Sequence, residues 1–477
     1  MAVKQIIEEM QEVFLQRSDA LAVSSGFCQR TSPISASAWV QGLVFGWLSD
    51  PNATVSSLAR ALAVAGTPVS PQAVQQRFSE AGATLLRGVL EALTAHALRE
   101  AAQRSPEKLQ PCHLSRQKHP QWLEAFPAIW LRDSTLIPLP SALHDKWPGT
   151  GKAKTQTQTG EQSTTAPSAS LKVSVKWEWH SGSIAPLHLT PGLDHDQKAA
   201  RQQDALQEKQ GHAPQAGEMH VFDLGFFALD SLAKLHSQSA YFCCRYKAGV
   251  LLQRLDTPSA DWCSSPLEWL QALPAEQPQA EWEVWLGDKA PIRVRLLAVR
   301  VPPAVALVRH EECLAQARRK GQRVSAARLA LCGWNLFVTN APACLLNASQ
   351  ARVLYGLRWQ IERLFRLWKE TLQVDEWRSQ NPQRIECEVY AKLIGALLTQ
   401  TLTAFCAWHD PARSLVKCAQ TIAQHALGLL THLCFDEALK RELQALQRAC
   451  SVAAKLDYRK QKPATFQRLK EVQNSLA

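Results

Sequence analysis

The sequence predicts a mixed α/β fold with a helical region at each end of the chain. Short apolar segments with β-strand periodicity are confined to the middle of the chain, and helical segments separate several of them. Helical periodicity dominates residues 1 to about 105 and most of the chain after Asn347. Apolar residues make up 46% of the 477 residues, which is enough for a sizeable core and excludes a wholly disordered chain.

The N-terminal region contains a segment that fits two helical interpretations. SSLARALA and PQAVQQRF are predicted helices, GTPVS is the turn between them, and a Ser cap and a Pro open the second helix. This pattern is typical of a helix-turn-helix DNA-binding motif. It is equally typical of a plain helical hairpin, because turn spacing alone is weak evidence.

The central strands and helices follow one another in an order that indicates the sheet type. AIWLRDSTLI (128–137) is typical of a buried strand, and LKVSVKWEW (171–179) forms a predicted hairpin with IAPLHLTP. A helix over 196–209, a strand over 220–227, a second helix and the strand AYFCCRYK follow. This order fits a ribonuclease-H-like mixed sheet and neither an all-α nor an all-β protein.

These patterns divide the chain into five expected regions. They are a helical, helix-turn-helix-like region (1–105), the first part of a ribonuclease-H-like core (106–250), a β-rich insertion (251–332), the second part of the core (333–400) and a helical C-terminal tail (401–477). Within the core, residues 106–125 are predicted to be a linker and the polar residues 151–170 a mobile loop.

One predicted helix, from Tyr355 to Leu372, concentrates polar side chains of mixed charge beside an apolar face. At about 100° per residue, five of these side chains fall within a stripe about 80° wide. They are Tyr355, Arg358, Glu362, Arg366 and Lys369. The stripe fits an ordinary solvated face with a weak ion pair between Glu362 and Arg366. Its composition also suits a divalent ion beside phosphates, because one carboxylate stands among cations.

The stripe reads Y-x2-R-x3-E-x6-K, which resembles the signature of the IS-four-type bacterial transposases of the DDE class. Three further segments agree with the resemblance. RDST (132–135) resembles the first-aspartate strand of that family, DLGFF (223–227) its second-aspartate motif and LFVTN (336–340) the strand before its glutamate helix. The resemblance covers roughly residues 125 to 400.

The resemblance implies a set of site residues. Asp133, Asp223 and Glu362 would be the catalytic residues and the metal ligands, although each aspartate alone also fits a turn cap. Two Mg²⁺ ions, or Mn²⁺ as a substitute, would support hydrolysis and then strand transfer. DNA contacts would come from Tyr355, Arg358, Arg366 and Lys369.

By the same resemblance, the protein would be a DNA transposase that cuts and rejoins DNA at the ends of an insertion sequence. Its partners would be double-stranded DNA, as terminal inverted repeats and as target, and a second copy of the chain in a synaptic complex. Two alternatives stay open at this point. One is a catalytically silent DNA-binding regulator derived from a transposase, and the other is a stand-alone nuclease of ribonuclease-H-like fold.

Composition adds expectations about partners and compartment. Lys and Arg outnumber Asp and Glu by 53 to 42, which fits a polyanion partner and also ordinary variation in surface charge. The cysteines lack zinc spacing, so we expect reduced thiols, as at Cys243 and Cys244. The N-terminus lacks signal-peptide features, and residues 393–408 fit a buried helix. We therefore expect a cytoplasmic, nucleoid-associated protein without a membrane partner.

Other polar and aromatic residues are weaker candidates, each with an ordinary structural interpretation. Lys172 and Arg245 would approach phosphate or only flank strands, and Asp196, beside Asp194 and His195, would cap a helix. Trp282 and Trp285 would stack on an unpaired base or form a packed face. Asn340 would help to position the site or would close a strand.

Overall fold

The computed structural model describes residues 3–28, 33–103, 120–154, 165–257, 261–408, 410, 412–456 and 465–474. The chain divides into two compact units, and we describe each by itself. The first unit contains Met1–Lys118, Ser134–His212 and Gln360–Lys460. The second contains His119–Asp133, Ala213–Trp359 and Gln461–Ala477. Strand β1 (Ile129–Leu139) contributes residues to both.

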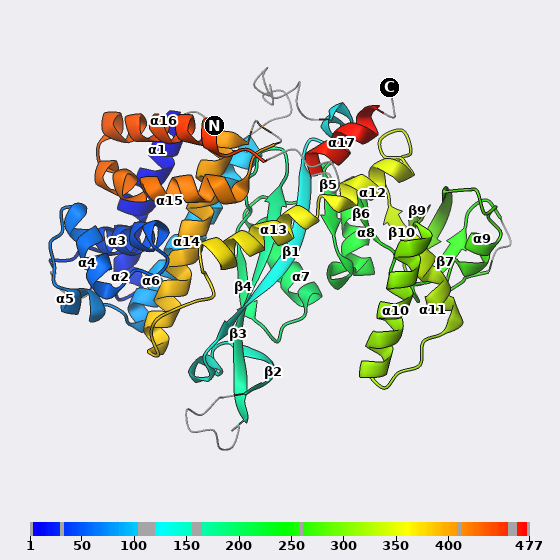
Figure 1. The fold of residues 1–477 in the computed structure, drawn as a ribbon, viewed down its shortest axis with the longest axis horizontal. Coiled ribbons are helices and arrows are strands. Elements are labelled where there is room, and N and C mark those ends of the chain that lie inside the picture. The colour runs from blue at the N-terminus through cyan, green and yellow to red at the C-terminus, as the bar shows by residue number, and fades with distance from the viewer. Residues whose placement is uncertain are drawn as a thin grey trace. The chain divides into compact units, whose positions relative to one another are not determined.

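Helices from the two ends of the chain pack together in the first unit (Figure 1). The long helix α14 packs against α3 and α6, and Gln11 Nε2 donates hydrogen bonds to Leu433 O (3.0 Å) and Asp436 Oδ1 (2.8 Å). The part of the C-terminal region before residue 461 is therefore built into this helical body. The helices are α1 (Val3–Gln11), α2 (Ser18–Ser24), α3 (Ala36–Ser49), α4 (Val55–Val64), α5 (Pro71–Gln75), α6 (Glu80–Gln103), α14 (Pro382–Ala407), α15 (Leu415–His432) and α16 (Asp436–Ala453).

Helix α14 is the core helix of this body. Among the described residues it is the one helix long and apolar enough to cross a membrane, but 89% of its apolar window is buried inside the protein. Burial against other helices accounts for its apolar sequence, because a helix that is apolar all round is typical of a protein core. The predicted buried helix over 393–408 is thus present as the second half of α14.

Both helices of the predicted helix-turn-helix segment are present. Helix α4 is followed by a turn and by α5, where the Ser70 side chain accepts a hydrogen bond from the Ala73 N–H as the predicted cap. Helix α5 has only five residues. A Cβ atom added to Gly42 in α3 would lie 2.5 Å from Leu62 Cγ in α4, so glycine allows these two helices to pack closely. A role of this segment in DNA binding stays a prediction.

The first unit also contains a small antiparallel sheet and one helix over it. Strand β3 (Thr165–Glu178) pairs with β2 (Pro148–Lys154) and with β4 (His188–Pro191), and α7 spans Asp196–Lys209. The β3–β4 hairpin and α7 confirm the sequence prediction. The mobile loop predicted over 151–170 is wrong at its two ends, which lie in β2 and β3, and its middle, 155–164, lies outside the described residues. Backbone pairing does not require apolar side chains, so the polar composition was misleading.

The predicted linker over 106–125 is only partly described. Residues 104–119 lie outside the described residues, and Gln121–Ala125 form one short helical turn.

The second unit is built on a mixed sheet in the order β1-β5-β6-β10-β9-β8-β7. Strands β1, β5 and β6 are parallel, and each later pair is antiparallel. The strands of the predicted insertion therefore extend the same sheet. The bounds are β5 (Met219–Phe222), β6 (Tyr241–Arg245), β7 (Leu252–Arg254), β8 (Gln279–Leu286), β9 (Ile292–Arg300) and β10 (Trp334–Thr339).

The predicted β-rich region 251–332 also contains a long helix that the sequence pattern did not indicate. Helix α10 (Pro303–Arg319) has no buried residue, so it lacks the apolar face by which periodicity identifies a helix. The other helices of this unit are α8 (Leu229–Ser237), α9 (Leu267–Gln271), α11 (Ala326–Ala330), α12 (Ala348–Gly356) and α17 (Thr465–Asn474).

Candidate active site

Asp133 and Asp223 occupy equivalent positions on two neighbouring parallel strands. The last pair in the β1–β5 register is Arg132 with Phe222, and each aspartate is the next residue along its strand. Neighbouring strands lie about 4.8 Å apart, so the two carboxylates stand side by side where the pairing ends. Asp133 lies within β1 and not at its end, because β1 continues to Leu139 after its pairing with β5 has ended.

The Asp223 side chain also caps a turn. One carboxylate oxygen, Oδ1, accepts a hydrogen bond from the Gly225 N–H at 2.9 Å, at the start of the helical turn Leu224–Phe226. The turn-capping interpretation is therefore correct for Asp223. It uses one oxygen of the carboxylate, and it fixes the orientation of the half-buried side chain.

Arg358 is paired with the first aspartate. Its Nη1 atom donates to Asp133 Oδ2 at 2.8 Å, and the two side chains are only 12% and 15% exposed. The same guanidinium group lies 5.8 Å from the centre of the Tyr355 ring, which in turn packs on Phe337 at 5.2 Å between ring centres. Arg358 and Tyr355 are thus at the same edge of the sheet as the two aspartates.

Burial raises the pKa of Tyr355 to about 12, so its side chain is a neutral phenol at neutral pH. Smaller contributions to this pKa come from the charges of Arg358, Arg245 and Asp223. Arg245 ends strand β6 and pairs in register with Phe337. The second unit therefore gathers two carboxylates, two guanidinium groups and one phenol at a single edge of its sheet. Arg245, a weaker candidate from sequence, belongs to this group.

The predicted single helix Tyr355–Leu372 is wrong, because the structure breaks it into separate segments. Helix α12 ends at Gly356, a turn contains Arg358, and α13 (Trp359–Arg366) leads into a wider helical turn over Leu367–Thr371. The backbone N–H groups at the break bond three residues back, as in a tight turn. Glycine is a poor helix former, which explains the end of α12 at this position.

The remaining residues of the predicted stripe lie in the first unit. Glu362 is half-buried in the first turn of α13. Lys369 Nζ donates to the carbonyl of Leu136 in β1 at 2.7 Å, so this lysine is anchored to the strand that also contains Asp133. Arg366 is 67% exposed and pairs with Glu370 at 3.7 Å.

Several weaker candidates have structural roles. Lys172 is buried and pairs with Asp196 (2.9 Å), and Asp196 also accepts a hydrogen bond from Ser134. The residue at the cap position of α7 is His195, so the predicted capping role of Asp196 is wrong. The Asp194 carboxylate pairs with Lys198 at 2.8 Å.

Packing and strand direction define the roles of the two tryptophans of β8 and of Asn340. Trp282 packs on Trp269 at 5.8 Å between ring centres, and Trp285, three positions along the strand, points to the opposite face. The two tryptophans therefore do not form one packed face. Asn340 bonds the Phe242 N–H and the Ala240 carbonyl, each at 2.8 Å, at the opposite edge of the sheet from Asp223. It closes a strand.

The described residues include no group of three Asp, Glu, His or Cys side chains arranged to hold a metal ion. At the site, the second unit by itself contributes two carboxylates, and one of them, Asp133, forms an ion pair with Arg358. The described cysteines are free thiols, and burial raises the pKa of Cys243 to about 12. Cys243 and Cys244 are thus buried thiols of the core, as predicted, whereas Cys344 and Cys434 are exposed.

This edge of the sheet therefore carries two aspartates, two arginines and a phenol, which are side chains that can hold a divalent cation and contact phosphate oxygens. The family model of the transposase DDE domain matches residues 125–398, which is more than half of the chain. The chain therefore belongs to the DDE transposase family.

Relatives with similar sequences are transposases of bacterial insertion sequences. The chain is 26% identical over 413 residues to the transposase for insertion sequence element IS231F from Bacillus thuringiensis subsp. israelensis, covering 82% of this chain and 78% of the relative. It is 24% identical to the IS231B transposase from subsp. berliner (80% and 75% covered). It is 23% identical to the IS1151 transposase from Clostridium perfringens (58% and 57% covered).

Among solved structures, a piggyBac transposase synaptic complex with hairpin DNA is similar over 92% of this chain and 84% of that chain. The TM-score is 0.42 and the identity is 10%, a likeness too low to support a conclusion about this chain.

Proposed function

We propose that the protein cuts and rejoins DNA at the ends of an insertion sequence. The observation that carries this proposal is the register that sets Asp133 beside Asp223 on parallel strands, with Arg358 bonded to Asp133. The family supports it, since relatives matched over most of their length are transposases for insertion sequence elements. We further propose that the sheet is the ribonuclease-H-like core expected from the order of strands and helices.

Glu362 is the third acid of the proposed site, and two constraints within the chain support it. Glu362 follows Arg358 by four residues, and four residues span at most about 14 Å. Lys369, a few residues beyond Glu362, is bonded to Leu136, which lies three residues beyond Asp133 on the same strand. Both constraints keep the glutamate helix close to the strand of the first aspartate.

The donor set fits a hard divalent cation, because three carboxylates supply only oxygen ligands. Asp133, Asp223 and Glu362 would hold two Mg²⁺ ions, with Mn²⁺ as a substitute, and these would polarise the phosphodiester and activate its attacking water. Arg245 and Arg358 provide positive charge for the non-bridging phosphate oxygens. Tyr355, neutral at physiological pH, can donate a hydrogen bond to the same group.

Two displacements at one site would then account for cutting and rejoining. In the first, water attacks phosphorus and a 3′-hydroxyl leaves. In the second, that 3′-hydroxyl attacks a phosphodiester of the target DNA and becomes joined to its phosphorus, while a 3′-hydroxyl of the target strand leaves. Joining two element ends to one target requires two active sites, so we propose a homodimer on double-stranded DNA, in the cytoplasm at the nucleoid.

A cleavage assay with the full chain tests this function. DNA that carries the element's own terminal repeats should be cut at the repeat ends with Mg²⁺ or Mn²⁺, and chelator should stop the reaction until excess Mg²⁺ is added. Binding without cleavage under every metal condition would instead indicate a silent regulator. Cleavage of any DNA regardless of the repeats would indicate a stand-alone nuclease.

A basic segment at the end of α10 supports DNA as the partner. Arg318, Arg319, Lys320 and Arg323 are exposed, and the sequence between them contains no acidic residue. The parts of the chain that the structure describes provide no ion pair for these four side chains. Four exposed cations without acidic neighbours are free to neutralise phosphates and release counterions.

Replacing these four residues by Ala should weaken DNA binding mainly at low salt. Each lost phosphate contact lowers the slope of log K against log salt by about 0.9, so the slope should fall by up to about 4. Fluorescence anisotropy of labelled DNA over a salt series measures this slope. The matched control replaces Lys4 and Lys440, exposed lysines that pair with Glu8 and Glu437, and should leave it unchanged. Equal slopes for both variants would show that the segment does not contact DNA.

A further inference from the structure

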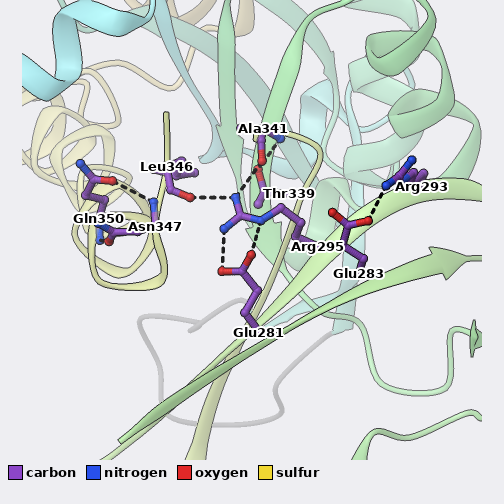
Figure 2. Close-up of polar contacts among 9 residues, drawn as sticks. All are labelled: Glu281, Glu283, Arg293, Arg295, Thr339, Ala341, Leu346, Asn347 and Gln350. Atoms are coloured by element: carbon purple, nitrogen blue, oxygen red, sulfur yellow. Dashed lines mark hydrogen bonds and ion pairs between the residues drawn. The ribbon is translucent and has the colours of Figure 1, made fainter. Parts of the chain in front are cut away.

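Arg295 is a buried arginine at the centre of a hydrogen-bond network in the second unit (Figure 2). It lies in β9 and is 6% exposed. Its Nε and Nη2 atoms each donate to one oxygen of Glu281 at 2.6 Å, and its Nη1 atom donates to the carbonyls of Ala341 and Leu346 at 2.8 Å. One guanidinium group thus joins strand β8 to the segment between β10 and α12.

Arg293, two residues earlier on the same strand, provides a contrast (Figure 2). It pairs with Glu283 on β8, and these two side chains are 62% and 52% exposed. In Figure 2 the dashed line from Arg293 leads to Glu283, whereas Arg295 also bonds two backbone carbonyls. An exposed pair of this kind contributes little to stability. The Arg295 network is different. Glu281 is 35% exposed, but Arg295 is buried, and Ala341 and Leu346, whose carbonyls it bonds, are fully buried and would lose a strong donor without it.

The segment bonded to Arg295 sets the start of helix α12. Asn347 follows Leu346 directly and caps this helix, in a capping box with Gln350. Near the same end, Ser349 Oγ donates to Gln279 in β8 at 3.1 Å. Nine residues of helix, about 13 Å long, then lead from this edge of the sheet to Tyr355 at the aspartate edge.

We propose that Arg295, together with Glu281, is a positioning residue for the Tyr355 and Arg358 side chains. It acts through the start of α12 and does not contact DNA. Arginine suits this role because its planar group has five donors and stays charged, whereas lysine has three donors around one point. The cleavage rates expected below rest on the proposed function. The expected change in backbone order does not rest on it.

The test compares Arg295→Met, Arg295→Lys and Glu281→Gln with the matched control Arg293→Met in the full chain. With saturating repeat DNA, Arg295→Met should cleave about 100-fold more slowly, because a displacement of about 1 Å can have this effect. The Kd for DNA should change less than threefold. Arg295→Lys should recover part of the rate, and Arg293→Met should match the wild type.

Hydrogen exchange of the metal-free protein gives the second measurement, which needs no activity. Amides of residues 341–358 should exchange faster in Arg295→Met and Glu281→Gln, while those of β5 and β6 stay protected. If Arg295→Met does not fold, Glu281→Gln carries the test. Wild-type cleavage with unchanged exchange, or an equal loss of rate in Arg293→Met, would overturn the inference. An inactive wild type with the expected exchange pattern would count against the proposed function alone.

Discussion

Replacing Asp133, Asp223 or Glu362 by Ala is expected to abolish metal-dependent cleavage of repeat DNA. Each change removes one oxygen ligand and one negative charge, so the site loses metal occupancy together with the activation of water. The loss should be at least about 10³-fold, because the metal ions contribute several kcal/mol to stabilisation of the transition state. DNA binding should persist, since the substitutions also remove repulsion between carboxylate and phosphate.

The measurement is cleavage of repeat DNA, with a gel-shift assay in parallel. Asp288→Ala and Glu370→Ala are matched controls, because these acids are exposed and Glu370 lies beyond Glu362 on the same helical segment. Both controls should cleave at the wild-type rate. If folded Glu362→Ala protein retains substantial cleavage with Mg²⁺, Glu362 is not the third acid, and the two aspartates need another partner.

The sequence was sufficient where local patterns determine structure. The bounds predicted for α7 are those observed, and the strand with Asp133 lies where the apolar run indicated. The strand predicted over 220–227 is wrong in its second half, because β5 ends at Phe222 and a helical turn follows Asp223. Family membership followed from a few motif residues. Local patterns could not provide the register between β1 and β5. Arg132 pairs with Phe222 only through contacts between distant parts of the chain. That pairing is what sets the two aspartates side by side.

The errors of the sequence analysis have identifiable physical causes. Asp196 is the first residue of α7 and has the side chain of a good cap, but the preceding residue takes the cap position and buried Lys172 pairs with the Asp196 carboxylate. The helical pattern after Asn347 continues through Gly356, although the backbone turns there. Arg293 and Arg295 are indistinguishable by strand periodicity, and only the segment after β10 makes one of them a buried donor.

Arg358→Ala is expected to destabilise the metal-free protein far more than a change at an exposed arginine. The Arg358–Asp133 pair is 12% and 15% exposed, so removing the cation takes a close counter-charge away from a largely desolvated carboxylate. Breaking a buried pair in this way costs about 3–5 kcal/mol. Arg366→Ala, which removes a pair that is 67% and 71% exposed, should cost less than about 1 kcal/mol. Urea denaturation in the presence of chelator measures both.

Two measurements distinguish the loss of a counter-charge from a general packing defect. They are the effect of divalent cations on stability and the effect of a second substitution. In Arg358→Ala, Mg²⁺ should raise the unfolding midpoint more than in the wild type, because the cation then binds a carboxylate that Arg358 no longer neutralises. Combining Arg358→Met with Asp133→Asn should restore most of the lost stability, since the buried charge is then absent as well. If the double variant is as unstable as Arg358→Ala and Mg²⁺ has no larger effect, the pair contributes by packing and not by charge. Arg358 would then serve DNA contact alone.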